Sequence, residues 1–293
     1  DAAIRLPRIG FGCSRYRDGE YVDRADSVVA ALDAGYRLFD SAELYGNEGT
    51  VGDALAAPGA PDRRAVHVTS KVWNTNHGHV REACETTLDA LGLDTLDSYL
   101  VHWPDAWDYR GPLRGLASLP PDEGETLTFP RDDDGEIREA DVSLAETWRA
   151  MERLVDDGLT RTIGVCNASV EELDGLLESA RIRPAVVQVE RNPYEPRSAL
   201  VDYCHERGIR VVAHTPFSTR DLLAEPTVRS VADEEGITPA QAVLAWNVAD
   251  GVVPIPSSTD ETHVVENLAA GAVDLSADSR ARLDAMSAGG ESA

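Results

Sequence analysis

Four side chains within the first 102 residues carry groups that could move a proton together: Asp40, Tyr45, Lys71 and His102. A tyrosine has an ordinary pKa of about 10, and a neighbouring ammonium such as that of Lys71 favours phenolate and lowers that pKa. An aspartate can pair with the lysine, and a histidine can orient a carbonyl oxygen. The set suits reduction of an aldehyde or ketone, with the phenol as proton donor. Because no side chain supplies a hydride, this reaction requires a cofactor.

Lys71 is the only lysine in the chain, and the other basic residues are all arginines. Arginine stays charged and presents a planar fork, whereas a lysine is a compact charge whose pKa the protein can tune. Chance retention of one lysine is the alternative explanation. The favoured interpretation is a chemical requirement for an amine at this position.

These residues can act together only if the fold brings them to one place. Short apolar runs alternate with helical patterns along the whole chain. The candidate strands are 8–13, 36–40, 66–71, 98–102, 162–167, 186–190, 210–214 and 252–255. The candidate helices are 23–34, 49–55, 80–91, 144–157, 169–180, 198–206, 238–249 and 261–269.

Eight strand–helix units in 293 residues predict an α/β fold, a single-domain (β/α)8 TIM barrel that spans residues 1–293. A doubly wound sheet is the alternative, but no GxGxxG motif opens the chain. In the barrel, Asp40, Lys71 and His102 end three successive strands, and strand carboxyl ends converge on the face where barrel enzymes place their chemistry. Each residue alone could be a turn cap or a packed core residue. Their coincidence predicts a site.

Two segments depart from this rhythm. Residues 105–140 form a long acidic insertion after the fourth strand, too long for an ordinary connection. A substrate lid and a solvated insertion are equally consistent with its composition. Residues 276–293 form the tail, in which 276–286 resemble a final amphipathic helix.

The charge balance excludes whole classes of partner. The formal net charge is −25, which argues against binding to nucleic acid or to an anionic membrane. Dense carboxylates with almost no lysine also predict a halophilic organism, since high salt screens their repulsion. The four cysteines lack CxxC spacing, no metal-ligand pattern occurs, and no apolar run reaches 18 residues. We therefore expect a cytoplasmic protein, a monomer rather than an oligomer, with reduced thiols and no metal.

Several long motifs resemble the aldo-keto reductase family. The segment "GYRLFDSAELYGNEGTVGDAL" surrounds the Asp and Tyr, "HWP" begins at His102, and "TWRAMERLVDDGLTRTIGVCNAS" and "VQVERNPY" are further matches. The resemblance implies a nicotinamide cofactor at the carboxyl-terminal face and reversible carbonyl reduction. It also implies roles: Tyr45 as general acid, Lys71 as modulator of its pKa, Asp40 as the lysine's partner and His102 as the carbonyl-orienting group.

The same resemblance assigns residues to the cofactor and to the substrate. It implies that Asn167 and Gln188 hold the nicotinamide carboxamide, and that Ser258, Glu266 and Asn267 hold the adenosine end. The other cofactor positions implied are His214, Ser218, Ser257 and His263. Aromatic candidates for the carbonyl pocket are Tyr16, Trp73 and Trp103.

The chain also departs from the family pattern. Cys166 and Ala168 stand where a Ser and a Phe are common, and His214 stands where an aromatic residue commonly stacks on the nicotinamide. Ser257 and His263 replace the Lys and Arg that grip a 2′-phosphate in members that prefer NADP(H). We therefore expect use of NADP(H) with NAD(H) also accepted.

Two other functions fit parts of the sequence. Some proteins of this resemblance serve as non-catalytic or regulatory cofactor-binding subunits, although the intact set of Asp40, Tyr45, Lys71 and His102 disfavours that function here. A metal-dependent barrel hydrolase needs several converging His and carboxylate ligands. Only His102 and His214 end strands, so the hydrolase is disfavoured.

Overall fold

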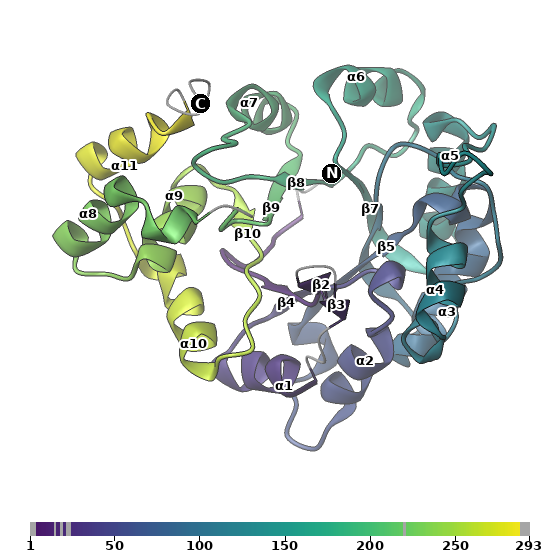
Figure 1. Cartoon of the computed structure of the whole chain (residues 1–293), viewed down its shortest axis with the longest axis horizontal. Coiled ribbons are helices and arrows are strands. Elements are labelled where there is room, and N and C mark those ends of the chain that lie inside the picture. The colour runs from purple at the N-terminus through teal and green to yellow at the C-terminus, as the bar shows by residue number, and fades with distance from the viewer. Residues whose placement is uncertain (1–3, 15, 18–19, 22–24, 219–220, 288–293) are drawn as a thin grey trace.

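A computed structural model describes residues 4–14, 16–17, 20–21, 25–218 and 221–287. Eight parallel strands form one sheet, and helices surround it (Figure 1). In sheet order the strands are β1 (Phe11–Gly12), β4 (Leu38–Asp40), β5 (His67–Val72), β6 (Leu96–Val101), β7 (Thr160–Cys166), β8 (Val186–Glu190), β9 (Arg210–His214) and β10 (Val253–Pro254). The predicted (β/α)8 barrel is confirmed.

Main-chain hydrogen bonds close the sheet between its first and last strands. Gly10 N–H donates to the Pro254 carbonyl at 3.0 Å, and Gly12 N–H donates to the Pro256 carbonyl at 3.0 Å. A Cβ atom at Gly12 would lie 2.7 Å from the Ile255 carbonyl oxygen, so the closure requires glycine there. A closed ring of parallel strands excludes the doubly wound sheet.

Helices follow the strands and cover the outside of the barrel. The connecting helices are α1 (Ala25–Ala34), α2 (Glu48–Ala56), α3 (Val80–Leu91), α5 (Leu144–Asp156), α6 (Val170–Ser179), α7 (Ser198–Glu206), α9 (Pro239–Ala249) and α10 (Glu261–Ala269). Helices α5, α6 and α9 begin with full capping boxes, in which Ser143, Ser169 and Thr238 accept the main-chain N–H of the third helical residue. Each such cap stabilises its helix by roughly 1 kcal/mol and fixes where the preceding loop ends.

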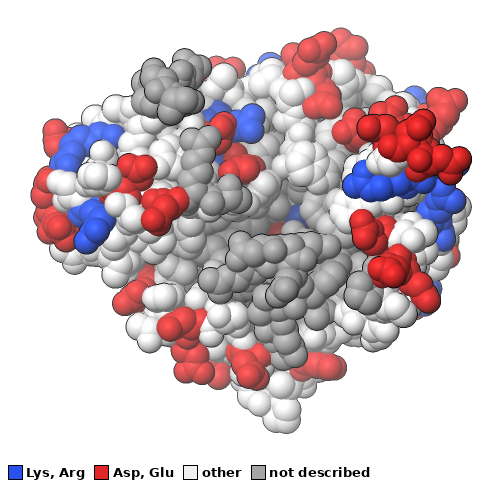
Figure 2. Space-filling model, in the orientation of Figure 1, with Lys and Arg blue, Asp and Glu red and all other residues white. Residues whose placement is uncertain are grey.

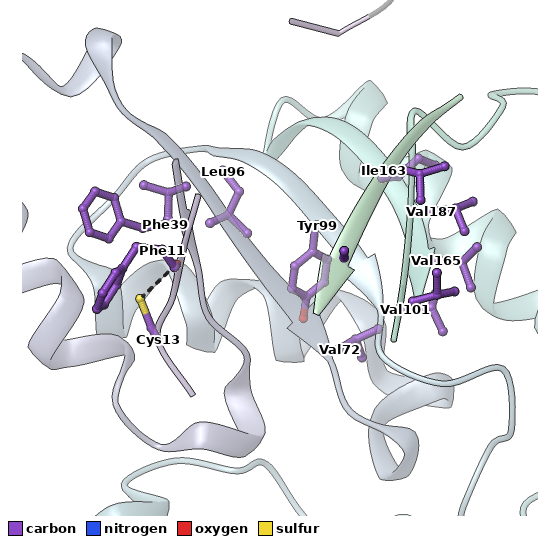
Figure 3. Packing of buried hydrophobic residues seen from close by; sticks show 14 of the residues in the cluster. Phe11, Cys13, Phe39, Val72, Leu96, Tyr99, Val101, Ile163, Val165 and Val187 are labelled. Carbon is purple, nitrogen blue, oxygen red and sulfur yellow. Dashed lines mark hydrogen bonds between the residues drawn. The ribbon is translucent and has the colours of Figure 1, made fainter. Parts of the chain in front are cut away.

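Strand periodicity divides the core into two layers. Outward side chains such as Phe39, Tyr99 and Val165 pack against the helices (Figure 3). Inward side chains, among them Leu38, Val186 and Val212, fill the barrel. Because successive strand residues alternate between the two sides, the residue two positions after each of these inward residues also points inward, nearer the carboxyl end. Those residues are Asp40, Gln188 and His214.

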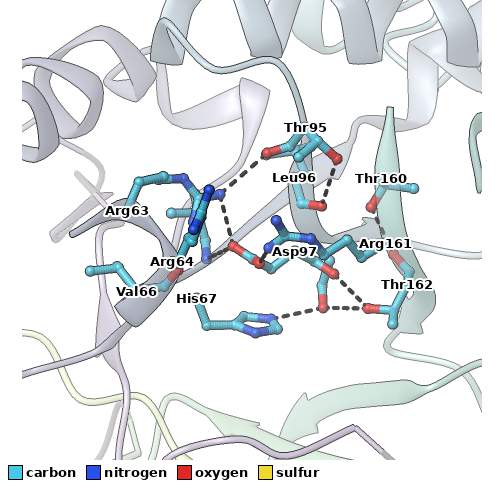
Figure 4. A network of polar contacts seen from close by, with 12 residues as sticks. Arg63, Arg64, Val66, His67, Thr95, Leu96, Asp97, Thr160, Arg161 and Thr162 are labelled. Carbon is cyan, nitrogen blue, oxygen red and sulfur yellow. Dashed lines mark hydrogen bonds and ion pairs between the residues drawn. The ribbon is translucent and has the colours of Figure 1, made fainter. Parts of the chain in front are cut away.

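The amino-terminal face of the barrel carries a polar network (Figure 4). Asp97, near the start of β6, accepts hydrogen bonds from Val68 N–H at 2.9 Å and from Arg161, and pairs with Arg63 at 2.8 Å. Burial raises the pKa of Asp97, but the Val68 N–H and Arg63 outweigh burial and lower it. This face is opposite the carboxyl ends of the strands, where barrel enzymes place their chemistry, so the network serves stability.

The insertion at 105–140 folds onto the carboxyl-terminal face. It contains α4 (Pro121–Thr128), which the composition of this segment did not predict. Apolar residues of the insertion, Leu113 and Phe129, pack against Trp73, and the Trp73 indole N–H donates to the Thr128 carbonyl at 2.8 Å. The insertion is therefore a folded wall beside the site, with its acids on the outside.

Among the remaining elements, a hairpin and a helix before α9 were not predicted, whereas the final helix was. A hairpin of β2 (Tyr16–Arg17) and β3 (Glu20–Tyr21) follows β1 and lies over the strand ends in Figure 1. Helix α8 (Pro226–Glu235) precedes α9. Helix α11 (Ala277–Asp284) is the predicted final helix, slightly shorter than 276–286. In the described part of the chain, no helix is both long and apolar enough to cross a membrane.

Candidate active site

A buried ion pair lies at the carboxyl end of the barrel. Lys71 Nζ donates to a carboxylate oxygen of Asp40 and to the Ser41 carbonyl at 2.8 Å. Burial lowers the pKa of Lys71, but the nearby Asp40 and Tyr45 outweigh burial and raise it. The lysine is 0% exposed, so its charge is held in place by these partners. Gln188 donates to the other oxygen of Asp40 at 2.7 Å.

Tyr45 ends the short helix η1 (Glu43–Tyr45), which follows β4 directly. The centre of its ring lies 5.2 Å from Lys71 Nζ. Burial raises the pKa of the phenol, and the Lys71 charge opposes that effect without overcoming it. The expectation that Lys71 brings this pKa below its ordinary value is therefore wrong for the protein without cofactor. The phenol is protonated at neutral pH, which is the state a proton donor needs.

His102 follows β6 and lies between two aromatic rings. The ring centres of Tyr45 and Trp73 are 5.9 and 5.0 Å from its own, both edge-on. Burial, then the charge of Lys71 and the neighbouring His214, hold the pKa of His102 well below its ordinary value. A neutral imidazole beside a neutral phenol can hydrogen-bond a carbonyl oxygen without binding a proton from solvent.

These groups line a cavity of about 400 Å³ at the carboxyl-terminal face. Asp40, Tyr45 and His102 are among its lining residues, and Lys71 lies buried beneath. Figure 2 shows the hollow at the centre of the molecule, with acidic and basic side chains visible at its floor. The four residues predicted to act together therefore lie together, at the face where barrel enzymes bind substrate.

The carboxamide and serine side chains assigned to the cofactor lie along two connected cavities. Asn167, Gln188, His214, Ser218 and Ser257 line the first. A second cavity of about 700 Å³ shares Phe217 and Ser257 with the first. The assigned residues that line this second cavity are Ser257, Ser258, His263, Glu266 and Asn267.

The donor set along this groove fits an extended dinucleotide. Carboxamides stand at the end near Tyr45, and hydroxyl groups follow toward α10. One side-chain amide hydrogen of Asn167 and the side-chain oxygen of Gln188 take no part in the hydrogen bonds described between protein groups. These are the partners that a nicotinamide carboxamide requires. At the far end, Asp260 caps α10 by accepting from Thr262 and His263 N–H.

The three aromatic candidates for the carbonyl pocket have different positions. Trp103 is 42% exposed and lines the first cavity beside His102. Trp73 is 4% exposed and packs edge-on against His102, so its assignment to the carbonyl pocket stays a prediction. Tyr16 belongs to β2, but its side chain lies outside the described part of the structure.

Sequence reasoning missed two buried carboxyl groups beside the site. Glu43 accepts the Trp73 main-chain N–H and two contacts from the Asn76 amide, at 3.0 and 3.1 Å. Burial raises its pKa to about 8. Glu48 accepts the Ser70 hydroxyl at 2.5 Å, and burial raises its pKa to about 6. Ser70 precedes Lys71 on β5 and therefore points to the opposite side of the strand, out of the barrel. A polar side chain at that outward position was the available sign of a polar partner, which is Glu48.

No group of three or more His, Cys, Asp or Glu residues is placed to hold a metal ion within the described ranges. The polar groups at the strand ends form the ion pair and hydrogen bonds described above. The fold and the site together define a barrel oxidoreductase: a phenol, a buried ammonium and a neutral imidazole beside a groove that fits a dinucleotide.

Comparison with known proteins specifies the family. Residues 8–288 match the Aldo/keto reductase family. Aldose reductase B of Dictyostelium discoideum is 39% identical over 274 residues, covering 91% of this chain and 84% of that protein. Aldo-keto reductase family 1 member A1-A of Danio rerio is 38% identical over 280 residues, covering 90% of this chain and 81% of that protein.

Solved structures show the same likeness. The aldose reductase of Giardia lamblia superposes with a TM-score of 0.85 at 34% identity, covering 97% of this chain and 92% of that one. The aldose reductase of Schistosoma japonicum superposes with a TM-score of 0.84 at 33% identity, covering 96% of this chain and 89% of that one. The chain belongs to the aldo-keto reductase family. It is an NADP-dependent oxidoreductase that reduces carbonyl groups of small molecules.

Proposed function

We propose that Tyr45 is the general acid of this carbonyl reduction. The observation that carries the proposal is the half-buried phenol, whose ring centre lies 5.2 Å from Lys71 Nζ at the edge of the cavity. A protonated phenol donates to the carbonyl oxygen as negative charge develops there, and Lys71 stabilises the phenolate that remains. Asp40 holds Lys71, and His102 orients the carbonyl oxygen through its neutral imidazole.

The bound nicotinamide supplies the hydride in this reaction. We assign Asn167 and Gln188 to its carboxamide, because both amides are fixed by partners in the barrel wall. His214 and Ser218 line the same end of the groove, and Ser257, Ser258, His263, Glu266 and Asn267 line the adenosine end. Trp103 and the wall formed by the insertion shape the carbonyl pocket.

Dual use of NADP(H) and NAD(H) is the second part of the proposal. Ser257 and His263 line the second cavity and stand where the family resemblance implies the Lys and Arg that hold a 2′-phosphate, and neither carries a permanent positive charge. A dianionic phosphate there would lack two charge-assisted hydrogen bonds, each worth roughly 1.5–3 kcal/mol. Hydroxyl groups of Ser257, Ser258 and Thr259 remain as neutral donors for either cofactor.

The proposal extends to the setting of the enzyme. Acidic side chains predominate over basic ones on the face shown in Figure 2, and the net charge of the whole chain is −25. Such a surface suits a monomer in a high-salt cytoplasm and repels nucleic acid and anionic membranes. A non-catalytic regulatory role is disfavoured, because the buried Asp40–Lys71 pair lies beside Tyr45 at the cavity, as proton transfer to a bound carbonyl requires.

The test is Tyr45→Phe, assayed by the absorbance of the reduced nicotinamide with an aromatic aldehyde at molar KCl. We expect carbonyl reduction to fall by about 10²–10⁴ or more, because the only proposed proton donor is lost. Cofactor binding, measured by protein fluorescence, should persist, since the ring remains. A variant with near-normal turnover would contradict the role of Tyr45.

A further inference from the structure

A chain of three side chains connects the end of β9 to His102. His214 Nδ1 lies 3.0 Å from the Thr215 hydroxyl, and His214 Nε2 lies 2.9 Å from Asn167 Oδ1. Asn167 Nδ2 in turn donates to the His102 carbonyl at 2.9 Å. Three elements of the barrel, β6, β7 and β9, therefore meet in one series of hydrogen bonds at the cavity.

The direction of every hydrogen bond in this chain is determined. A main-chain carbonyl only accepts, so the His102 carbonyl fixes which end of the Asn167 amide is nitrogen. Asn167 Oδ1 only accepts, so His214 Nε2 carries the hydrogen. Burial, then the charges of Lys71 and Arg197, lowers the pKa of His214 to about 4, and the ring is neutral at physiological pH. Its Nδ1 therefore accepts from the Thr215 hydroxyl.

The main chain at both ends of this series is held in an uncommon conformation. Asn167 has φ 58° and Thr215 has φ 49°. The left-handed region is unfavourable for a β-branched residue such as threonine, and such residues persist only where surrounding contacts hold them. Asn167 N–H is also fixed, because it donates to the Gln188 carbonyl at 2.8 Å. The contacts thus hold Asn167 from three sides.

We propose that His214 is a positioning residue for His102, acting through Asn167. The His214 Nε2–H donates to Asn167 Oδ1 and thereby holds the amide in the orientation in which Asn167 Nδ2 donates to the main-chain carbonyl of His102. This proposal rests on the proposed function, because it presumes that His102 orients the carbonyl. An aromatic hydrocarbon ring at this position could stack on a nicotinamide but could not hold Asn167.

Three variants separate positioning from stacking. His214→Phe keeps a flat ring and removes both nitrogens, so kcat should fall, by up to about 10²-fold, as expected when a reacting group is displaced by 1 Å. KM for the carbonyl substrate should change much less, and the dissociation constant of the reduced cofactor should rise by a smaller factor than kcat falls, because Asn167 is also assigned to the nicotinamide carboxamide. His214→Gln loses the ring but keeps an amide N–H that can reach Asn167 Oδ1, so its kcat should exceed that of His214→Phe. Thr215→Val removes the hydroxyl group that donates to His214 Nδ1, so the ring should no longer be restricted to the Nε2–H tautomer. Thr215→Ser keeps a hydroxyl group and should keep that tautomer.

A nuclear magnetic resonance readout on the protein without cofactor makes the test independent of turnover. The wild-type His214 ring should show the Nε2–H tautomer, and the Asn167 side-chain amide signal should move in His214→Phe more than in His214→Gln. Wild-type kcat in His214→Phe, or a His214 ring protonated at Nδ1 instead, would overturn the proposal. If Tyr45→Phe keeps full activity while the tautomer and amide shifts are as expected, the proposed catalytic role fails and this hydrogen-bonded series stands.

Discussion

Trp73 donates its main-chain N–H to the buried carboxyl group of Glu43, two residues before Tyr45 in the chain. The same carboxyl group accepts from the Asn76 amide, so Glu43 joins the helix that carries Tyr45 to the loop that follows Lys71. Two segments that supply the proposed catalytic groups are thereby held together by one side chain that is not among the residues lining the cavity.

Glu43 also makes the stability of the enzyme depend on pH. Its pKa is about 8 in the folded protein and 4.5 as the ordinary value, because burial disfavours the charged form. The buried position accepts the protonated carboxyl group and disfavours the charged one. The stabilisation by the protonated group is therefore fully present below pH 4.5 and is lost as the pH rises through 8. Each unit of pKa corresponds to about 1.4 kcal/mol, so the loss amounts to several kcal/mol.

We expect Glu43→Gln to flatten this dependence, because the amide cannot ionise. Thermal midpoints measured from pH 5 to pH 9 should decline less in the variant than in the wild type. Glu48→Gln is the matched comparison, and its effect should end near pH 6, where the Glu48 carboxyl group titrates. Parallel curves for wild type and Glu43→Gln would show that Glu43 is ionised throughout this range.

Replacing the single lysine tests why it is present. Lys71→Arg keeps the positive charge, but a planar guanidinium cannot occupy the fully buried place of an ammonium between Asp40 and the Ser41 carbonyl. We expect turnover to fall by about 10²-fold or more through misplacement of the charge. The control is Arg81→Lys, at a side chain that is 56% exposed, which should leave turnover unchanged. Normal activity in Lys71→Arg would make the single lysine a coincidence.

The sequence predicted the barrel well because strand ends carry a strong pattern. An apolar run that ends in Asp40 or His102 indicates both a strand and the position of its carboxyl end, which lies at the active face of the barrel. Contacts between distant segments were not predictable in the same way. Glu43 lies in a polar stretch that suggests a surface residue, and only the folded loop after β5 reveals that Trp73 and Asn76 cover it.

Composition also misled at the insertion. Turn-forming and acidic residues in 105–140 indicate a loop, yet α4 forms there with Pro121 at its first position, where a proline is favourable. The apolar residues Trp107, Leu113 and Phe129 carried the missed signal, since a fully solvated insertion has no use for them. Their common partner, Trp73, is far away in the sequence, so only tertiary structure identifies it.

Stability should rise with salt. The net charge of −25 produces self-repulsion that is strong in dilute buffer and falls as the Debye length shortens, from about 10 Å at 0.1 M to about 3 Å at 1 M. We expect the thermal midpoint to increase steadily as KCl is raised from low to molar concentration at fixed pH. A flat or falling trend would refute adaptation to a high-salt cytoplasm.

Cofactor preference should respond to two surface positions. The double change Ser257→Lys and His263→Arg restores a point charge and a fork beside the groove, and we expect kcat/KM for NADPH to rise relative to NADH. A wild-type preference for NADPH of about a thousandfold or more would show that other residues bind the phosphate.

The solitary lysine gives the enzyme a natural spectroscopic reporter. Protein grown with isotopically labelled lysine carries the label at one position, and that nitrogen is the one hydrogen-bonded to Asp40 and Ser41. Because Lys71 is shielded from water, exchange of its ammonium hydrogens should be slow enough to observe. The protonation state and surroundings of the catalytic centre can thus be followed through cofactor binding and turnover in the unaltered enzyme, with no resonance assignment to perform.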